Sequence, residues 1–399
     1  HDFTNGFIHH SMDNHQSIRD DLSALDDEGL TRSLRTLNES GGKIEWNGKP
    51  YINFSSNDYL NLANDTRVKA GAIKAIEEFG CGATASRLMA GHLAIHETLE
   101  QEIAAWLKLE QCLVFPSGFQ ANLGMVTSVS EESGTVFSDA LNHASIVDGC
   151  RLSGAEISIF RHLDYEHLEE LLETDQSSGR KLIVSDSVFS MDGDLADLVR
   201  LAELAGKYEC LLAIDEAHAL GVYGEGRGLC HALGVAPDIV VGTMTKSFGS
   251  GGGFIAAAAP FRSLFINKAR SFIFSTGLSP ACAGGALASL DVMRSDASLG
   301  TTLLQRSHEF RALLTDQGVD VPADDSQIIP IMIGENAHAV RVMNALLEDG
   351  ILLAAVRPPS VPEGTARLRI SVTLAHQSGD LEHAAQKIAR ALQPSGAHS

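Results

Sequence analysis

Short runs of apolar, mostly β-branched residues recur through the middle of the chain, separated by stretches with helical periodicity. The runs are CLVF (112–115), TVF (135–137), EISIF (156–160), KLIVS (181–185), LLAID (211–215) and DIVVG (238–242). Between them, stretches such as HLEELLE (167–173) and LVRLAELAGKY (198–208) place apolar residues every three or four positions. Strands that alternate with helices in this way predict a mostly parallel sheet with helices on both faces.

The N-terminal segment has a different pattern. The stretch IRDDLSALDDEGLTRSLRTL (18–37) is amphipathic and predicts one helix, which a Gly-Gly turn and a strand-like run over 51–54 follow. Because the regular alternation begins only at about residue 51, we interpret residues 1–50 as an N-terminal arm. The large domain is then expected to cover residues 51–290.

The C-terminal segment changes pattern again. Two helical stretches, over 303–318 and 339–350, flank the strand-like run SQIIPIMIG. This mixture predicts a small α+β domain over residues 291–399. The expected fold class is therefore α/β, with a large domain built on a mostly parallel sheet and a small C-terminal α+β domain.

Composition and charge narrow the class of protein. The chain has 399 residues and is 44% hydrophobic, so it can bury a large core without disulfides, and its six scattered cysteines are expected to be buried free thiols. The net charge of −21 argues against a nucleic-acid partner. No apolar run approaches the roughly 18 residues of a membrane span, and the N-terminus lacks a secretory pattern, so we expect a cytoplasmic protein with no membrane association.

A lysine stands between a predicted strand and a glycine-rich run in GTMTKSFGSGGG (242–253). The glycines follow Lys246, whereas in a phosphate-binding P-loop they precede the lysine. Partial burial at a strand end would lower the pKa of Lys246 and free its amine to form a Schiff base with an aldehyde. The alternative is an ordinary surface lysine in a loop.

An acidic residue ends another apolar strand, in LLAIDEAH (211–218). If buried, the carboxylate of Asp215 needs a cationic or donor partner, and a protonated pyridine nitrogen would supply one. His218 follows three residues later and can reach the same ligand. The alternative is that Asp215 caps a following helix.

Further turns carry candidate ligand-binding residues. In NHAS (142–145), the imidazole of His143 can stack on a flat aromatic cofactor, although a loop histidine is also a common helix cap. In PSGF (116–119), glycine between a strand and a helix exposes backbone N–H groups that suit a phosphate, although ordinary turns share this pattern. SVFSMDGD (187–194) also follows a strand. All these turns follow the carboxyl ends of predicted strands, where open α/β sheets bind ligands.

Taken in chain order, these motifs resemble the α-oxoamine synthase family, a group of fold-type I (aspartate aminotransferase-like) enzymes that use pyridoxal 5′-phosphate (PLP). The resemblance runs from about residue 30 to 390. It is carried by the segments FSSNDYL, SGFQAN, DALNHASIVDGCRL, VFSMDGD, IDEAHALGVYGEGRG, GTMTKSFGSGGG, FIFSTGLSP and RPPSVPEGTARLRIS. It implies a PLP-dependent transferase that forms a homodimer.

The resemblance implies a role for each matching residue that contacts the PLP ring. Lys246 would hold PLP as a Schiff base and then act as the base at the Cα atom of the amino acid. Asp215 would pair with the pyridine nitrogen, and His218 would hydrogen-bond the ring hydroxyl. His143 would stack on the ring, and Ser190 would lie close to it.

The resemblance also implies how the phosphate and the substrates are bound. Arg357 would bind the carboxylate of the amino acid, and Ser360 and Arg32 are expected to meet the substrates, with Arg32 on the acyl side. The residues expected to hold the phosphate are Gly118, Phe119 and Thr243, with Ser275 and Thr276 lent by a second subunit.

The implied reaction is the decarboxylative condensation of an amino acid with an acyl thioester. SGFQAN and RPPSVPEGTARLRIS are most similar to members that join L-alanine to a pimeloyl thioester in biotin synthesis, so these substrates are expected. The thioester could be carried by coenzyme A or by an acyl carrier protein. The alternatives are a member of the family that uses glycine, serine or another acyl chain, an aminotransferase, and a PLP-binding scaffold without activity.

Two residues depart from the family pattern, and one motif lies outside it. Asn61 stands where glycine usually follows SNDYL, and Ser360 replaces the threonine of RPPT, which puts the turn and the fit of the substrate in question. His92 and His96 share a helix face, but no glutamate follows His92 as H-E-x-x-H requires, so no metal site is expected.

Overall fold

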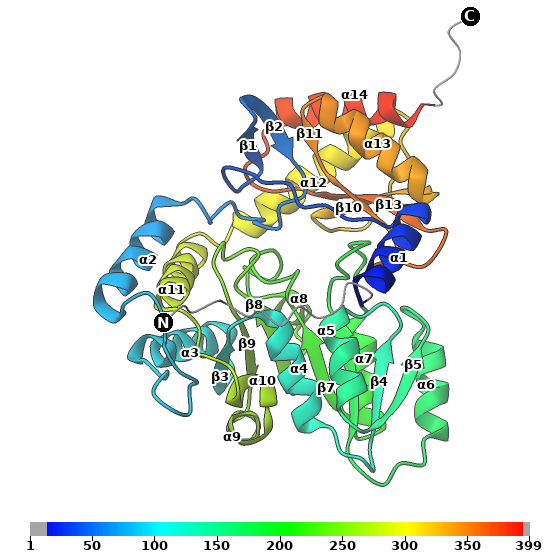
Figure 1. The fold of residues 1–399 in the computed structure, drawn as a ribbon. Coiled ribbons are helices and arrows are strands. Elements are labelled where there is room, and N and C mark those ends of the chain that lie inside the picture. The colour runs from blue at the N-terminus through cyan, green and yellow to red at the C-terminus, as the bar shows by residue number, and fades with distance from the viewer. Residues whose placement is uncertain (1–13, 394–399) are drawn as a thin grey trace, which may run out of the picture.

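The computed structural model describes residues 14–393 and contains a seven-stranded sheet with the strand order β3-β9-β8-β7-β6-β4-β5 (Figure 1). The strands are β3 (Gln111–Phe115), β4 (Thr135–Asp139), β5 (Glu156–Phe160), β6 (Lys181–Asp186), β7 (Leu211–Asp215), β8 (Ile239–Thr243) and β9 (Gly253–Ala257). The six strands expected from the apolar runs are all present, and the α/β fold class is confirmed.

Strand β9 was not predicted, because GFIAA directly follows a run of glycines, which is more typical of a loop. It pairs antiparallel with both β3 and β8, whereas the pairs from β8 through β7, β6 and β4 to β5 are all parallel. The sheet is thus mostly parallel, with one strand reversed inside it.

Helices cover both faces of this sheet (Figure 1). Along β3, Leu113 and Phe115 pack in one apolar cluster, and Cys112 and Val114 pack in the other, because side chains alternate between the faces of a strand. The first face is covered by α4 (Gly118–Val129), α5 (Ala144–Leu152), α9 (Ala259–Lys268) and α10 (Arg270–Ile273). The helices of the other cluster are α2 (Thr66–Phe79), α3 (Ala94–Leu107), α6 (Tyr165–Thr174), α7 (Leu198–Lys207), α8 (Leu229–Leu233) and α11 (Pro280–Ser295).

Two small sheets lie beyond the carboxyl ends of the parallel strands (Figure 1). One contains β10 (Ile328–Gly334), β13 (Ala366–Ser371) and β12 (Ala354–Val356), and the other contains β1 (Lys43–Trp46), β2 (Lys49–Asn53) and β11 (Ile351–Leu352). The associated helices are α12 (Leu299–Asp316), α13 (Asn336–Glu348) and α14 (Ser378–Leu392). Because β2 pairs with β11, residues far apart in sequence share one sheet; the division of the chain near residues 50 and 290 stays a prediction.

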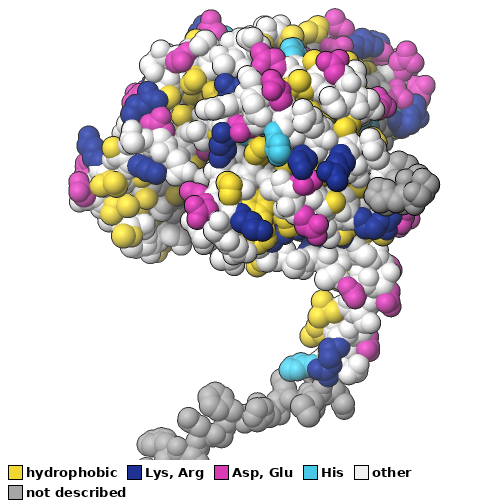
Figure 2. Space-filling view, turned by 90° about the horizontal axis from the view of Figure 1, so that it is seen from above, with side chains coloured by type: hydrophobic (Ala, Val, Ile, Leu, Met, Phe, Trp, Pro, Cys, Tyr) yellow, Lys and Arg dark blue, Asp and Glu magenta, His cyan; other side chains and the backbone are white. Residues whose placement is uncertain are grey.

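The expected helix over 18–37 is wrong in its second half: α1 (Asn14–Asp27) ends ten residues earlier. Gly29 has a φ of +65°, and the N–H of Leu30 donates to the carbonyl of Leu25 at 2.8 Å, which closes the helix with a glycine cap. Figure 2 shows α1 standing away from the body of the molecule, and its apolar side chains Ile18, Leu22 and Leu25 are exposed.

Two composition-based expectations can be compared with the structure. Cys81 is exposed, which contradicts the expectation that every cysteine is buried, whereas Cys112, Cys150, Cys210 and Cys230 are buried. Within residues 14–393, no helix combines the length and the apolar character that a membrane span requires.

Candidate functional site

A pocket of about 330 Å³ lies between the carboxyl edge of the large sheet and the segment that contains β12. Seven residues that the sequence singled out line it: Arg32, His143, Ser190, His218, Lys246, Arg357 and Ser360. They come from the N-terminal arm, from loops after β4, β6, β7 and β8, and from the segment after β12. The fold therefore brings these distant motifs to one place.

Lys246 follows β8 and is half-buried in this pocket. Burial lowers the pKa of Lys246 to about 8, although the negative charges of Asp215 and Asp186 act in the opposite direction. A lysine with this pKa is about half free amine at pH 8, whereas an ordinary lysine is almost fully protonated there, and the free amine is the form that attacks an aldehyde.

Asp215 ends β7 and is buried. Its Oδ2 atom accepts a hydrogen bond from Nδ2 of Asn122 at 2.6 Å, and its Oδ1 atom accepts one from the N–H of Ala217 at 2.8 Å. The chain after Asp215 forms a turn, so the carboxylate does not cap a helix as the alternative proposed. Its remaining lone pairs can accept a further N–H.

His143 caps α5, as the alternative proposed, and also lines the pocket, so its stacking on a cofactor stays a prediction. Its Nδ1 atom lies 2.7 Å from Oγ of Ser145, and that oxygen also accepts a hydrogen bond from Asn122 at 3.0 Å. Because the hydroxyl group of Ser145 donates its one proton to Nδ1, that nitrogen must be the acceptor. The proton of the neutral imidazole is therefore on Nε2. Burial lowers the pKa of His143, which keeps the ring neutral and suited to stacking.

His218 is buried in the turn after β7. Its Nδ1 atom lies 2.6 Å from the hydroxyl oxygen of Tyr59, so the ring is held in one orientation. Burial lowers the pKa of His218 well below its ordinary value, and the positive charge of Lys246 acts in the same direction. The imidazole is therefore neutral and can exchange a hydrogen bond with a hydroxyl group.

The expected phosphate cradle lies at the start of α4, beside the end of β8. A Cβ atom added to Gly118 would lie 3.2 Å from Cβ of Thr243, and one added to Gly253 would lie 2.4 Å from the backbone nitrogen of Gly118. Glycine at these positions therefore lets three backbone segments approach one another. The first N–H groups of α4 then form a positive helix end that suits a phosphate.

Ser275 and Thr276 lie beside this cradle in the same chain. Oγ of Ser275 accepts a hydrogen bond from Nε2 of Gln120, in the first turn of α4, at 3.1 Å. Thr276 forms an antiparallel bridge with Ser86. Their expected contribution from a second subunit stays a prediction.

The arm contacts the pocket at Arg357. The guanidinium of Arg357 donates to the backbone carbonyl of Gly29 and, at 3.4 Å, to that of Thr31. Arg32 in turn donates to the carbonyl of Pro358 at 3.0 Å. Burial lowers the pKa of Arg357, and the neighbouring charge of Arg32 lowers it further. Two cations therefore stand at one side of the pocket, available to a carboxylate.

Four residues of the site were quoted within family segments but received no role from the sequence. Asn57 and Arg369 line the pocket, and Nη1 of Arg369 donates to Oδ1 of Asn57 at 3.1 Å. Tyr59 holds His218, and Asn122 joins Asp215 to Ser145. The signal was their position in FSSNDYL, SGFQAN and ARLRIS, but their partners are distant in sequence.

His92 and His96 make structural hydrogen bonds to neighbouring segments of the chain. Nδ1 of His92 accepts a hydrogen bond from Arg87 at 3.0 Å, and Nε2 of His96 lies 2.7 Å from the carbonyl oxygen of Leu278. Over residues 14–393, no group of three or more His, Cys, Asp or Glu side chains is arranged to hold a metal ion.

The residues of the site fit PLP on three counts. Lys246 presents an amine of lowered pKa for the aldehyde, and Asp215 presents a carboxylate for the pyridine nitrogen. The start of α4 presents N–H groups for the phosphate, and Thr243 packs so closely against Gly118 that a side chain there would be crowded.

Comparisons with known proteins show similarity along most of this chain. Residues 49–388 match the protein family described as aminotransferase class I and II. The chain is 41% identical to 8-amino-7-oxononanoate synthase of Lysinibacillus sphaericus over 377 residues, which is 93% of this chain and 96% of the relative. It is 43% identical to the enzyme of the same name from Geobacter sulfurreducens over 381 residues, or 94% and 97% of the two chains.

Solved structures show the same similarity. Serine palmitoyltransferase of Sphingomonas wittichii superimposes with a TM-score of 0.87 at 30% identity, covering 95% of this chain and 97% of the other. An 8-amino-7-oxononanoate synthase of Francisella tularensis superimposes with a TM-score of 0.73 at 26% identity, covering 85% and 97%.

The fold and the site define a PLP-dependent transferase of fold type I. This class contains many reactions, and the sequence relatives narrow it. The chain belongs to the α-oxoamine synthase family.

Proposed function

We propose that this chain condenses L-alanine with a pimeloyl thioester to form 8-amino-7-oxononanoate, CO2 and the free thiol, as a step of biotin synthesis. The names of its relatives at 41% and 43% identity support this proposal. In the reaction, the new C–C bond joins Cα of alanine to the acyl carbon, while the thiolate and then CO2 leave.

A second cavity carries the proposal most directly. It has a volume of about 630 Å³ and lies next to the pocket of Lys246, with which it shares the lining residues His143, Ser190, Met191 and Ser360. Its apolar lining is Ala140, Leu141, Ala144, Val147, Phe189, Met191, Pro359, Val361 and Pro362. Arg151 is its one lysine or arginine, and we propose that it meets the distal carboxylate of the pimeloyl chain.

The residues of the first pocket divide the remaining work. We propose that Arg357 binds the carboxylate of alanine and that Lys246, with its pKa of about 8, takes the proton from Cα near neutral pH. PLP, when bound, supplies the electron sink that stabilises the negative charge on Cα. Asp215 keeps that sink effective by accepting the pyridine N–H, and neutral His218 accepts or donates at the ring hydroxyl.

A homodimer is part of the same proposal. Four large apolar side chains are exposed next to the phosphate cradle: Leu88 (51%), Met89 (83%), Phe119 (43%) and Phe274 (71%). Their segments are joined by the Ser86–Thr276 bridge and the Gln120–Ser275 hydrogen bond, so they form one surface. Exposed apolar surface of this kind is typical of a subunit interface.

The test is turnover by the purified, PLP-loaded protein with thiol and CO2 release measured together. Equal release of both from L-alanine plus pimeloyl-CoA is the expected result. The same assay with glycine plus acetyl-CoA and with L-serine plus palmitoyl-CoA covers other members of the family. Release only with one of these pairs would contradict the proposed substrates, and amino transfer without thiol release would identify an aminotransferase.

The carrier of the acyl group is decided in the same assay by replacing pimeloyl-CoA with the thioester of an acyl carrier protein.

An Arg151→Gln variant, compared with an Arg161→Gln variant outside the cavity, tests the proposed contact between Arg151 and the distal carboxylate. We expect KM for the pimeloyl donor to rise about tenfold in the first, as for a lost charged hydrogen bond, and to stay unchanged in the second.

A further inference from the structure

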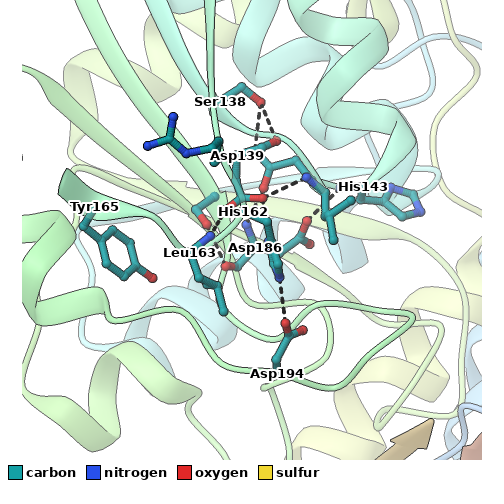
Figure 3. A network of polar contacts seen from close by, with 12 residues as sticks. Ser138, Asp139, His143, His162, Leu163, Tyr165, Asp186 and Asp194 are labelled. Carbon is teal, nitrogen blue, oxygen red and sulfur yellow. Dashed lines mark hydrogen bonds and ion pairs between the residues drawn. The ribbon is translucent and has the colours of Figure 1, made fainter. Parts of the chain in front are cut away.

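A histidine that lines neither pocket lies between two carboxylates behind the site (Figure 3). His162 stands in the turn between β5 and α6. Its Nδ1 atom is 2.8 Å from Oδ1 of Asp139, and its Nε2 atom is 2.6 Å from Oδ2 of Asp194. Only 22% of the His162 side chain is exposed, so water screens these contacts little.

Asp139 fixes one side of this arrangement to the large sheet. It ends β4, and its two carboxylate oxygens also accept hydrogen bonds from the N–H of Leu141 at 2.8 Å and of Leu163 at 3.0 Å. The same strand end leads to His143, four residues later, whose N–H donates to Asp186. Through Asp139, His162 is therefore attached to the end of β4, where the turn that carries His143 begins.

Asp194 places the other side of the arrangement in a loop. Residues 188–195 form this loop, closed by a bridge between Val188 and Leu195 and by hydrogen bonds between Phe189 and its partners Gly193 and Asp194 at 2.9 and 3.0 Å. The ring of Phe189 also packs edge-on against His162, with 4.5 Å between the ring centres. His162 thus contacts both the first and the last part of the loop.

The tip of the 188–195 loop reaches the substrates. Ser190 and Met191 line the pocket of Lys246, and with Asp192 they line the larger cavity. Strand β13 holds the tip from the opposite side, because Nε of Arg369 donates to the carbonyl of Ser190 at 2.6 Å and Arg367 pairs with Asp192. The loop is therefore fixed between the large sheet and a small one.

Both ring nitrogens of His162 face carboxylate oxygens, which requires an N–H at each nitrogen and hence an imidazolium. Burial acts to lower the pKa of His162, but the hydrogen bonds to Asp139 and Asp194 outweigh it and raise the pKa to about 9. The other titratable groups nearby are engaged elsewhere. Tyr165 of α6 accepts from Asp197 N–H, Asp186 of β6 accepts from His143 N–H, and Arg161 pairs with Asp164 in the same turn.

We propose that His162 is a positioning residue: protonated between Asp139 and Asp194, it holds the 188–195 loop so that Ser190 and Met191 form the shared wall of the two pockets. The effect on turnover rests on the proposed function, but the effect on the loop does not. Losing the proton leaves one carboxylate facing a lone pair, so this contact to the loop weakens as the pH rises through about 9.

Hydrogen exchange of the PLP-loaded protein tests the loop without any substrate. In His162→Gln, the amide can donate to only one carboxylate at a time. We expect the protection factors in peptides spanning 187–196 to fall roughly ten- to hundredfold, as for a lost charged hydrogen bond. Protection in α7 should not change, and the absorbance of lysine-bound PLP should persist.

Asp194→Asn is the matched variant. Its amide can donate to Nε2 of a neutral His162, while Nδ1–H still donates to Asp139, so the contact no longer needs the second proton. Wild-type protection and kcat/KM for the thioester should fall above about pH 9. At pH 8 the Asp194→Asn protein should have nearly wild-type protection and kcat/KM. Above about pH 9 neither quantity should fall in this variant, although Lys246 titrates in it as in the wild type. Asp194→Ala should behave like His162→Gln.

Unchanged protection of 187–196 in both His162→Gln and Asp194→Ala would overturn the proposal, as would the same alkaline fall in Asp194→Asn. Should His162→Gln fail to fold, the two Asp194 variants decide the question, because that side chain lies in the loop. A wild-type protein that turns over no thioester contradicts the proposed function, while the exchange data still decide the role of His162.

Discussion

At the scale of single residues, the site depends on burial, which sets the protonation states of its histidines and of its lysine. His143 and His218 have lowered pKa values and stay neutral, while Lys246 is held close to its titration point. The carboxylate of Asp215 is fixed by hydrogen bonds from Asn122 and from the N–H of Ala217. Environments that push such values apart are typical of acid–base sites.

The pKa of Lys246 predicts how PLP loading depends on pH. Below about pH 8 the amine is protonated and cannot attack the aldehyde, and above it the free amine dominates. The rate of PLP capture by the apoprotein should therefore rise with pH and level off above about 8, followed by the absorbance of lysine-bound PLP. Lys246→Ala should show no capture, and a rise that continues to pH 10 without levelling would contradict the lowered pKa.

Asn122 is predicted to support Asp215. Asn122→Ala removes the donor to a buried carboxylate oxygen, which should cost about 1–3 kcal/mol of unfolding free energy and weaken PLP binding. Denaturant unfolding and PLP titration measure the two effects. Thr127→Ala, on a half-buried position of the same helix, is the control and should leave PLP affinity unchanged; equal affinity in both variants would show that Asn122 has no such role.

Asn61 is a departure from the family pattern that the structure explains. Its φ is +57°, a left-handed conformation that glycine favours, and its N–H donates to the carbonyl of Asp58 at 3.0 Å. Asparagine tolerates this conformation better than other side chains. The turn after SNDYL is therefore compatible with Asn61 in place of glycine.

At the scale of elements, the close approach of α4, β8 and β9 forms the cradle. Gly253→Ala would place a Cβ atom 2.4 Å from the nitrogen of Gly118, and the atoms nearest to it are all backbone, which leaves little room to adjust. We expect a loss of about 2–3 kcal/mol in unfolding free energy and at least about tenfold weaker PLP binding.

Gly206→Ala is the control for this prediction. Gly206 lies in α7, and a Cβ atom added there meets nothing within 4 Å. That variant should be neutral or more stable by about 0.5 kcal/mol, since alanine favours helix. Wild-type PLP affinity in Gly253→Ala would mean that the cradle does not depend on this close approach.

At the scale of the whole molecule, the proposed dimer predicts that a charge at the exposed apolar surface separates the subunits. Met89→Glu should shift the protein from dimer to monomer in sedimentation experiments, because the charge would have to be buried. Ile159→Glu is the control: Ile159 is 60% exposed on β5, at the other edge of the sheet. A monomeric wild type, or a dimer unaffected by Met89→Glu, would contradict this interface.

Local pattern was sufficient for the six strands and for the turns that carry Lys246, Asp215 and His143, because burial imposes a period and parallel strands end at one edge. The end of α1 was missed because an amphipathic period continues past Gly29, where the backbone turns. Contacts between distant segments were also missed. Asn122 reaches Asp215, and Arg357 reaches Gly29, only after the fold has placed their elements together.

The sequence by itself thus determined the alternating α/β pattern and the chemistry of each motif, since both depend on neighbouring residues. Only the tertiary structure decided that β9 enters the sheet reversed between β3 and β8, and that β2 pairs with β11. The same holds for the two carboxylates beside His162. Strand pairing and side-chain ionisation between such distant residues depend on which groups the fold buries together. The local periodicity of the sequence does not specify those contacts.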